Sequence, residues 1–192
     1  MDIKDEEYCD LQDEKLLEFI VCILKGEKNQ KEYQTISVDI PSKLAEAIEN
    51  IVGFSVADYG NEIDKGQTEH IWREHGVNGR SDNSMSDITN FARIGYVVNN
   101  FDKIREGRNK SKYKNADGTL AKTIEIQKKM GDNFYYVVEA VPDSKLKKLR
   151  VVSAFINRND TFSEVAVSND PSRYVRDEPQ PNVSSSEDII PN

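Results

Sequence analysis

Both histidines of the 192-residue chain lie in one short segment, "TEHIWREHGVNG", residues 68–79. His70 and His75 are five positions apart, so on one α-helix their side chains point about 140° apart. They can act on one substrate only if Gly76 ends the helix and places His75 at the start of a loop. The segment therefore predicts a helix that ends at Gly76.

Three interpretations of this segment remain open from spacing alone. His70 and Glu74 are four residues apart and could face one metal ion, but the chain has no third histidine to complete a ligand set. In a purely structural interpretation, His70 is a half-buried helix residue and His75 a cation that favours the C-terminal end of the helix dipole. In the third, the two histidines perform general acid–base catalysis.

Acid–base chemistry suits histidine because its pKa of about 6.5 allows proton exchange near neutral pH. RNA is a natural substrate, because the ribose 2′-hydroxyl can attack the adjacent phosphate when a base, an acid and cations are supplied. The cations could come from Lys128, Lys129 and Arg150, which lie in a basic part of the chain.

The elements that must position these residues follow from hydrophobic periodicity. Helices are predicted in four stretches, over residues 11–26, 41–53, 64–76 and 86–98, with an extended segment at 33–40. Three extended runs then follow, "GTLAKTIEIQKK", "NFYYVVEAV" and "LKKLRVVSAFIN", joined by the turn sequences "MGDN" and "PDSK". The pattern predicts an α+β fold with helices packed on a twisted antiparallel β-meander, to which "KSKYKNADG" adds a hairpin strand.

Composition and charge argue against some classes of protein. The net charge is −8 and the pI about 4.9, which argues against a protein that binds nucleic acid over its whole surface. Residues 103–150 nevertheless contain thirteen Lys or Arg against six Asp or Glu, so a local basic face is expected. Cys9 and Cys22 have no CxxC spacing and indicate free thiols. No 18-residue apolar run or basic leader is present, so a cytoplasmic protein without a membrane span is expected.

A combination of motifs resembles a known family. "HIWREHG" is followed by "DITNFARIGYVVNNFDKI", "IEIQKKMGDNFYYVVEAV" and "LKKLRVVSAFINR". This order is similar to the phage-associated branch of the barnase, EndoU, colicin and RelE superfamily of nuclease domains. The resemblance implies a metal-independent endoribonuclease of toxin or effector type, associated with phage or prophage, that needs no cofactor.

The resemblance also implies roles for particular residues. The catalytic set is His70 as general base, His75 as general acid, Lys128 as the cation that holds the scissile phosphate, and Ser153 as a hydrogen-bond donor to it. Lys129, Arg150, Tyr136 and Arg158 are expected to bind substrate. Phe155 stands where the family frequently has Tyr, a change that removes a hydroxyl but keeps the apolar volume.

The expected organisation has three parts. Residues 1–40 form an N-terminal helix and extended lead-in, residues 41–158 the nuclease domain, and residues 159–192 an acidic, Pro- and Ser-rich tail that is mostly disordered. The expected partners are RNA, with tRNA as one candidate, and an immunity protein or a phage structural protein. Association with a virion or delivery into a host cytoplasm is consistent with the same resemblance. The alternative is a catalytically silent accessory module that binds nucleic acid or protein.

Overall fold

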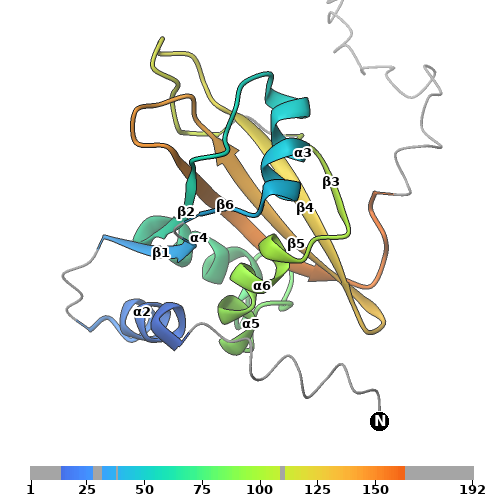
Figure 1. The fold of residues 1–192 in the computed structure, drawn as a ribbon. Helices are drawn as coiled ribbons and strands as arrows, with labels where there is room; N and C mark the ends of the chain where they lie inside the picture. Colours follow the sequence, from blue (N-terminus) through green and yellow to red (C-terminus); the bar gives the residue numbers. More distant parts are fainter. Residues whose placement is uncertain (1–13, 28–31, 38, 109–110, 163–192) are drawn as a thin grey trace, which may run out of the picture. The chain divides into compact units, whose positions relative to one another are not determined.

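The computed structural model describes residues 14–27, 32–37, 39–108 and 111–162 (Figure 1). The described residues up to Asp160 form one compact unit, and those from Thr161 belong to another. The predicted disorder of the tail falls on residues 163–192, which lie outside the described residues, as does Cys9. Cys22 is a free thiol. No helix in the described ranges is long and apolar enough to cross a membrane.

The centre of the unit is a six-stranded sheet in the order β1-β2-β6-β5-β4-β3. Its strands are β1 (Tyr33–Ser37), β2 (Gly60–Asp64), β3 (Lys103–Glu106), β4 (Lys122–Met130), β5 (Asn133–Val141) and β6 (Lys148–Asn157). The predicted meander is confirmed as β4, β5 and β6, which pair antiparallel. The segment predicted to add a hairpin strand contributes only an isolated bridge between Lys114 and Leu120.

The expectation of a wholly antiparallel sheet is wrong at one pairing, because β2 runs parallel to β6. The sheet is therefore mixed, although the α+β class is as predicted. The sequence of β2, "GNEID", contains a single large apolar residue, Ile63, and so lacks the alternation by which a strand is recognised. Its hydrogen bonds to β1 and β6 define it as a strand.

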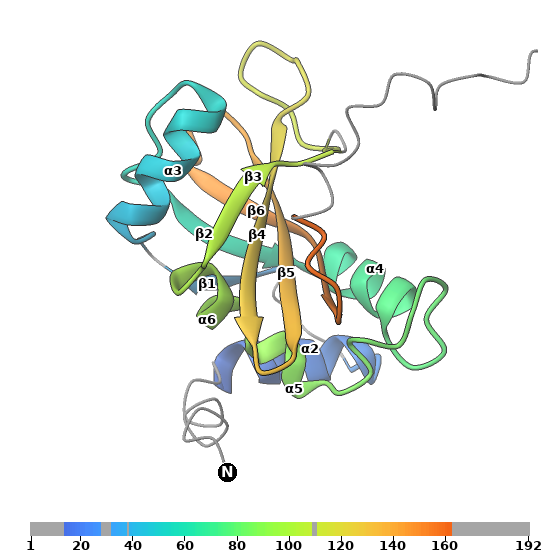
Figure 2. The ribbon, with the colours of Figure 1, turned by 90° about the vertical axis from the view of Figure 1, so that its right-hand side faces the viewer.

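The helices are α2 (Glu14–Leu24), α3 (Ser42–Val52), α4 (Lys65–His75), α5 (Thr89–Ala92) and α6 (Ile94–Asn99). Pro41 precedes α3 with a φ of −58°, and Gly53 ends it in the left-handed conformation at φ 88°, as proline and glycine favour at these positions. Figures 1 and 2 show α2 and α5 side by side at one end of the sheet. Because α2 packs against α4 and α5, the N-terminal helix belongs to the same core as the strands.

The helix predicted over residues 86–98 is two short helices, α5 and α6. The Arg93 N–H donates to the Asn90 carbonyl three residues earlier, at 3.3 Å, so the chain tightens into a 3₁₀-type turn between them. The side chain that binds the start of α5 is that of Asp87 and not of Ser86, the predicted N-cap. The Asp87 side chain accepts from the Thr89 N–H at 3.0 Å.

The sheet has two chemically different faces. Side chains alternate along β5, so Tyr135 and Val137 point to one side and Tyr136 to the other. The side of Tyr135 is covered by helices, since the Tyr135 hydroxyl donates to the Asn90 carbonyl of α5 at 2.5 Å. We call this the helix face. The other side, the front face, bears Tyr136 and the residues paired with it across the sheet, Gln127 of β4 and Phe155 of β6.

Candidate functional site

Helix α4 holds both histidines and is fixed at each end. Asp64 caps its N-terminus by accepting from the Gln67 N–H at 2.7 Å. In the orientation that satisfies both neighbours, the Gln67 amide donates to the Val152 carbonyl of β6 at 2.9 Å and accepts from Lys112 at 2.7 Å. Gly76 ends the helix as predicted, and a Cβ there would lie 2.4 Å from the Trp72 carbonyl oxygen. The helix therefore packs against β6, beyond the short stretch that pairs with β2.

His75 lies on the front face, where a carboxylate and an aromatic ring hold its imidazole. Its Nδ1 lies 2.9 Å from an Asp82 carboxylate oxygen, and its ring stacks on Phe155 with centroids 5.3 Å apart. Only 13% of the side chain is exposed. Burial raises the pKa of Asp82, but hydrogen bonds from Ser84 and His75 outweigh burial and hold this pKa below its usual value. A carboxylate accepts only, so the Asp82 contact requires the proton of neutral His75 to lie on Nδ1.

His70 has the opposite partner. Its Nδ1 lies 2.9 Å from Nη2 of Arg73, one turn along the same helix. Burial is the main cause that lowers the pKa of His70, and the Arg73 guanidinium lowers it further. The charge of His75 acts in the same direction, so the two imidazoles interact electrostatically. Guanidinium only donates, so Nδ1 of His70 accepts and the proton of the neutral ring lies on Nε2.

A second ring continues the stack from His75 into the sheet. The Phe155 ring lies 5.0 Å from the Tyr136 ring, at an interplanar angle of 16°. The Tyr136 hydroxyl accepts from Gln127 at 2.9 Å and donates to the Asn159 carbonyl at 3.1 Å, and the whole residue is buried. The prediction that Tyr136 contacts substrate is therefore wrong, because Phe155 and the chain after β6 cover it.

Lys128 does not join the histidines. It pairs across the strands with Tyr135, whereas the stack with His75 includes Tyr136, so Lys128 belongs to the helix face. Its Nζ binds a carboxylate oxygen of Asp102 at 2.7 Å. The second Asp102 oxygen accepts from the Lys129 N–H at 2.8 Å. The expectation that Lys128 converges with the two imidazoles is wrong. Its side chain points to the helix face, whereas His75 packs on the front face.

The remaining predicted residues are spread over the sheet. Ser153 pairs with Val138 and lies half-buried on the front face, placed there by a bulge in β6. Arg150 is buried and tied to Glu62 at 2.6 Å. Lys129 is exposed at the end of β4, with its ammonium 6.0 Å from the Phe134 ring. Arg158 is exposed just beyond β6.

Lys112 is a cation beside His70 that the sequence did not single out. It follows β3 in a loop fixed by Tyr113, whose hydroxyl donates to Asp64 at 2.6 Å. The Lys112 Nζ lies 3.7 Å from the same carboxylate, and its charge contributes to the lowered pKa of His70. The side chain is 58% exposed, so a ligand can reach it. Neither Lys112 nor Asp82 belongs to a recognisable motif, because each meets α4 only through a loop that folds back.

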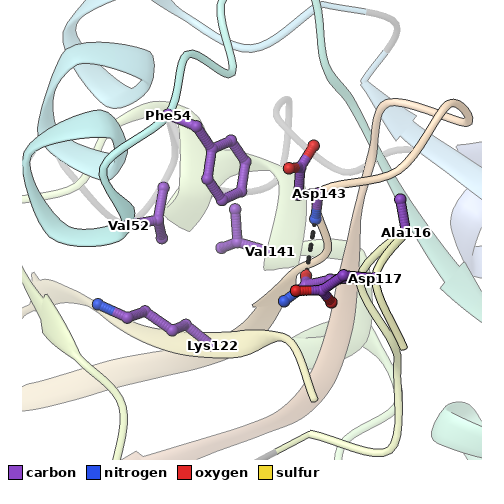
Figure 3. A pocket seen from close by; sticks show the side chains of 8 residues that line it. Val52, Phe54, Ala116, Asp117, Lys122, Val141 and Asp143 are labelled. Atoms are coloured by element: carbon purple, nitrogen blue, oxygen red, sulfur yellow. Dashed lines mark hydrogen bonds between the residues drawn. The ribbon is translucent and has the colours of Figure 1, made fainter. Parts of the chain in front are cut away.

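A surface hollow and the distribution of metal-ligating side chains were two other candidates for a site. The hollow in Figure 3 lies beside the end of α3 and is lined by Val52, Phe54, Asn115, Ala116, Asp117, Lys122, Val141 and Asp143. It contains neither histidine, and its two aspartates disfavour a phosphate. Among the residues that the structure describes, no three His, Cys, Asp or Glu side chains cluster as metal ligands would.

Comparison with known proteins gives one match. Residues 39–163, well over half of the chain, match the model of the family described as phage-Barnase-EndoU-ColicinE5/D-RelE like nuclease 3. No curated protein and no solved structure matches the chain. The matched range begins just before α3 and includes both histidines and Lys112.

Proposed function

This chain belongs to the phage-Barnase-EndoU-ColicinE5/D-RelE like nuclease 3 family, and from that premise we propose that it is a metal-independent endoribonuclease. The observation that supports this most directly is the pair of histidines on α4 with complementary partners, a carboxylate for His75 and a guanidinium for His70. One ring is thereby prepared to accept a proton and the other to donate a hydrogen bond.

The hydrogen bonds favour His75 as the general base, in place of His70, for which the sequence predicted that role. Because Nδ1–H of His75 is bound to Asp82, Nε2 is the atom that can take a proton from a ribose 2′-hydroxyl. The Asp82 carboxylate then stabilises the imidazolium that forms. Nε2–H of neutral His70 donates to a non-bridging phosphate oxygen, and Lys112 supplies the positive charge there.

The reaction that follows is cleavage by the substrate's own hydroxyl. The 2′-oxygen forms a bond to phosphorus, the bond from phosphorus to the 5′-oxygen breaks, and the departing 5′-oxygen takes a proton from water. The products are a 2′,3′-cyclic phosphate and a free 5′-hydroxyl. We infer that Ser153, half-buried on the front face, donates a further hydrogen bond to the phosphate.

Incubation of the full chain with total tRNA in excess EDTA tests this proposal. We expect cleavage that leaves 2′,3′-cyclic phosphate ends, and a loss of about 10²- to 10⁴-fold in His75→Ala. Asp82→Asn should retain binding and lose much of the rate. Cleavage that requires added Mg²⁺ would exclude the metal-independent mechanism. Salt-dependent RNA binding without any cleavage would favour the silent accessory module instead.

The toxin or effector role can be tested in the same variants. Intracellular cleavage of RNA by the wild-type chain should arrest the growth of a bacterial host, whereas induced His75→Ala should leave growth unchanged at equal protein level. Growth arrest by both proteins would mean that toxicity does not depend on cleavage.

A further inference from the structure

Tyr33 is an exposed aromatic residue with one side of its ring already covered. It is the first residue of β1, and 47% of it is exposed. The guanidinium carbon of Arg150 lies 4.5 Å from the ring centroid, as in a cation–π contact. The other surface of the ring is consequently where a planar group could stack.

Arg150 is held in place beneath the ring. Its Nη1 donates to Glu62 at 2.6 Å, and Lys148 lies 3.3 Å from the other oxygen of that carboxylate. Arg150 is itself buried, so its position does not depend on a ligand. A fixed guanidinium orients the tyrosine ring before any ligand arrives, and such preorganisation reduces the entropic cost of stacking.

Tyr33 also lies next to the histidine site. Its Cα partner across the β1–β2 pair is Asp64, so the two side chains share a sheet face. Asp64 caps α4 and is 3.7 Å from the Lys112 ammonium. The ring is therefore a neighbour of the residue that links the proposed phosphate cation to the helix of His70.

We propose that Tyr33 is a stacking platform for a nucleobase of single-stranded RNA, adjacent to the phosphate held by Lys112 and His70. The proposal rests on the proposed function, because it needs RNA as the substrate. Unstacked bases commonly bind aromatic side chains in this way, with little preference for base identity. Tyr33 lies outside the residues of the family match, which begins at residue 39.

A binding experiment tests the platform without cleavage. The probe is a single-stranded oligonucleotide with 2′-O-methyl groups and one 2-aminopurine base, whose fluorescence is quenched by stacking. The wild-type chain should bind and quench it. Tyr33→Ala should weaken binding about 5- to 100-fold, the range found when a base-stacking aromatic is removed, and abolish the quenching. Tyr33→Phe keeps the ring and should bind within about twofold of wild type.

Two controls separate stacking from general effects. Tyr33→Leu retains apolar volume without a π-face and should behave like Tyr33→Ala. Leu146→Ala removes another exposed apolar side chain, 70% exposed in the β5–β6 connection, and should not change binding. Equal melting temperatures of the variants would show that β1 is intact. Wild-type affinity and quenching in Tyr33→Ala would overturn the platform.

The outcomes also separate this proposal from the cleavage mechanism. If the platform is right and the mechanism wrong, Tyr33→Ala weakens oligonucleotide binding although His75→Ala and wild type show the same lack of cleavage. If the mechanism is right and the platform wrong, cleavage of tRNA depends on His75 while Tyr33→Ala changes neither KM nor binding. With both correct, Tyr33→Ala raises KM and leaves kcat within a few-fold of wild type.

Discussion

The front face of the sheet and the buried interior of its helix face surround their carboxyl groups differently. On the front face, carboxylates meet cations across neighbouring strands, as in the pairs of Arg105 with Glu125 and Arg150 with Glu62. On the helix face, Glu139 is fully buried and accepts from the side-chain amide of Asn61. Its second oxygen has no hydrogen-bond partner among the described residues. The paired carboxylates therefore stay charged, as Asp102 does beside Lys128 on the helix face, whereas Glu139, which is buried without a cation, favours its neutral form.

The burial of Glu139 also decides whether its shifted pKa can serve catalysis. Burial raises the pKa of Glu139 to about 7, although the hydrogen bond from Asn61 acts in the opposite direction. Such a shift can suggest a catalytic acid, yet this group is enclosed by the core and away from the stack of His75 on Phe155. A perturbed carboxyl group here affects stability, whereas the histidines of α4 are the groups that we propose to act on a substrate.

The largest expected effect concerns Glu139. Its folded-state pKa of about 7 is above the unfolded value, so its stabilising contribution is complete below about pH 4.5 and is lost as the pH rises to 7. Glu139→Gln stays neutral, so it should be more stable than wild type by roughly 2 to 4 kcal/mol at pH 8 and nearly equal to it at pH 4.5. Urea unfolding at the two pH values measures this.

Glu125→Gln is the matched control on the front face. It removes one charge from a pair with Arg105 that is mostly shielded from solvent, at 2.7 Å. We expect it to destabilise the protein at pH 8, opposite in sign to Glu139→Gln. A Glu139→Gln variant that gained the same stability at both pH values would show that the buried carboxyl group does not titrate.

The next largest effect compares two lysines of opposite faces. Lys112→Ala should reduce kcat/KM for RNA about 10- to 100-fold, because a cation at the phosphate is lost. Lys128→Ala should leave kcat/KM within about twofold, because its ammonium neutralises Asp102 on the helix face. Steady-state cleavage of one oligonucleotide by both variants makes the comparison.

RNA binding at several salt concentrations provides a second measurement for the same pair. The slope of log K against log salt should fall by about one in Lys112→Ala and stay unchanged in Lys128→Ala. The opposite ranking of the two lysines would restore the role that the sequence predicted for Lys128 and remove the one proposed for Lys112.

The sequence was sufficient for elements with strong local patterns. β4, β5 and β6 are runs of nine or ten residues rich in β-branched or aromatic side chains and separated by turn sequences, and α3 has proline and glycine at its ends, so both kinds of element were predictable. β2 was missed because hydrogen bonds to two distant strands define it. The break at Arg93 was missed because the apolar stripe continues through it.

The site was only half predictable for a related reason. His70, His75 and Gly76 lie in one segment, so their common helix and its end follow from local spacing. Asp82 and Lys112 approach that helix through loops, and no periodicity encodes such a contact. The sheet face of Lys128, in contrast, could have been predicted from the sequence. Strand alternation assigns it to the face opposite Gln127, and the two-residue turn at Gly131 fixes the register with Tyr136.

The smallest expected effect tests the electrostatics of His70. Arg73→Ala removes a donor and a positive charge from its Nδ1, so the pKa of His70 should rise toward its ordinary value while remaining lowered by burial. Neutral His70 is the form proposed to act, so its contribution to the acid limb of the cleavage profile should move to higher pH. Activity at pH 8 should change little, because His70 is neutral there in both proteins. Arg80→Ala removes an equal charge from an exposed position beside Glu74 and should leave the limb in place. A uniform loss of activity at every pH in Arg73→Ala would instead indicate that the guanidinium contacts RNA directly, and NMR titration of the His70 ring distinguishes the two explanations.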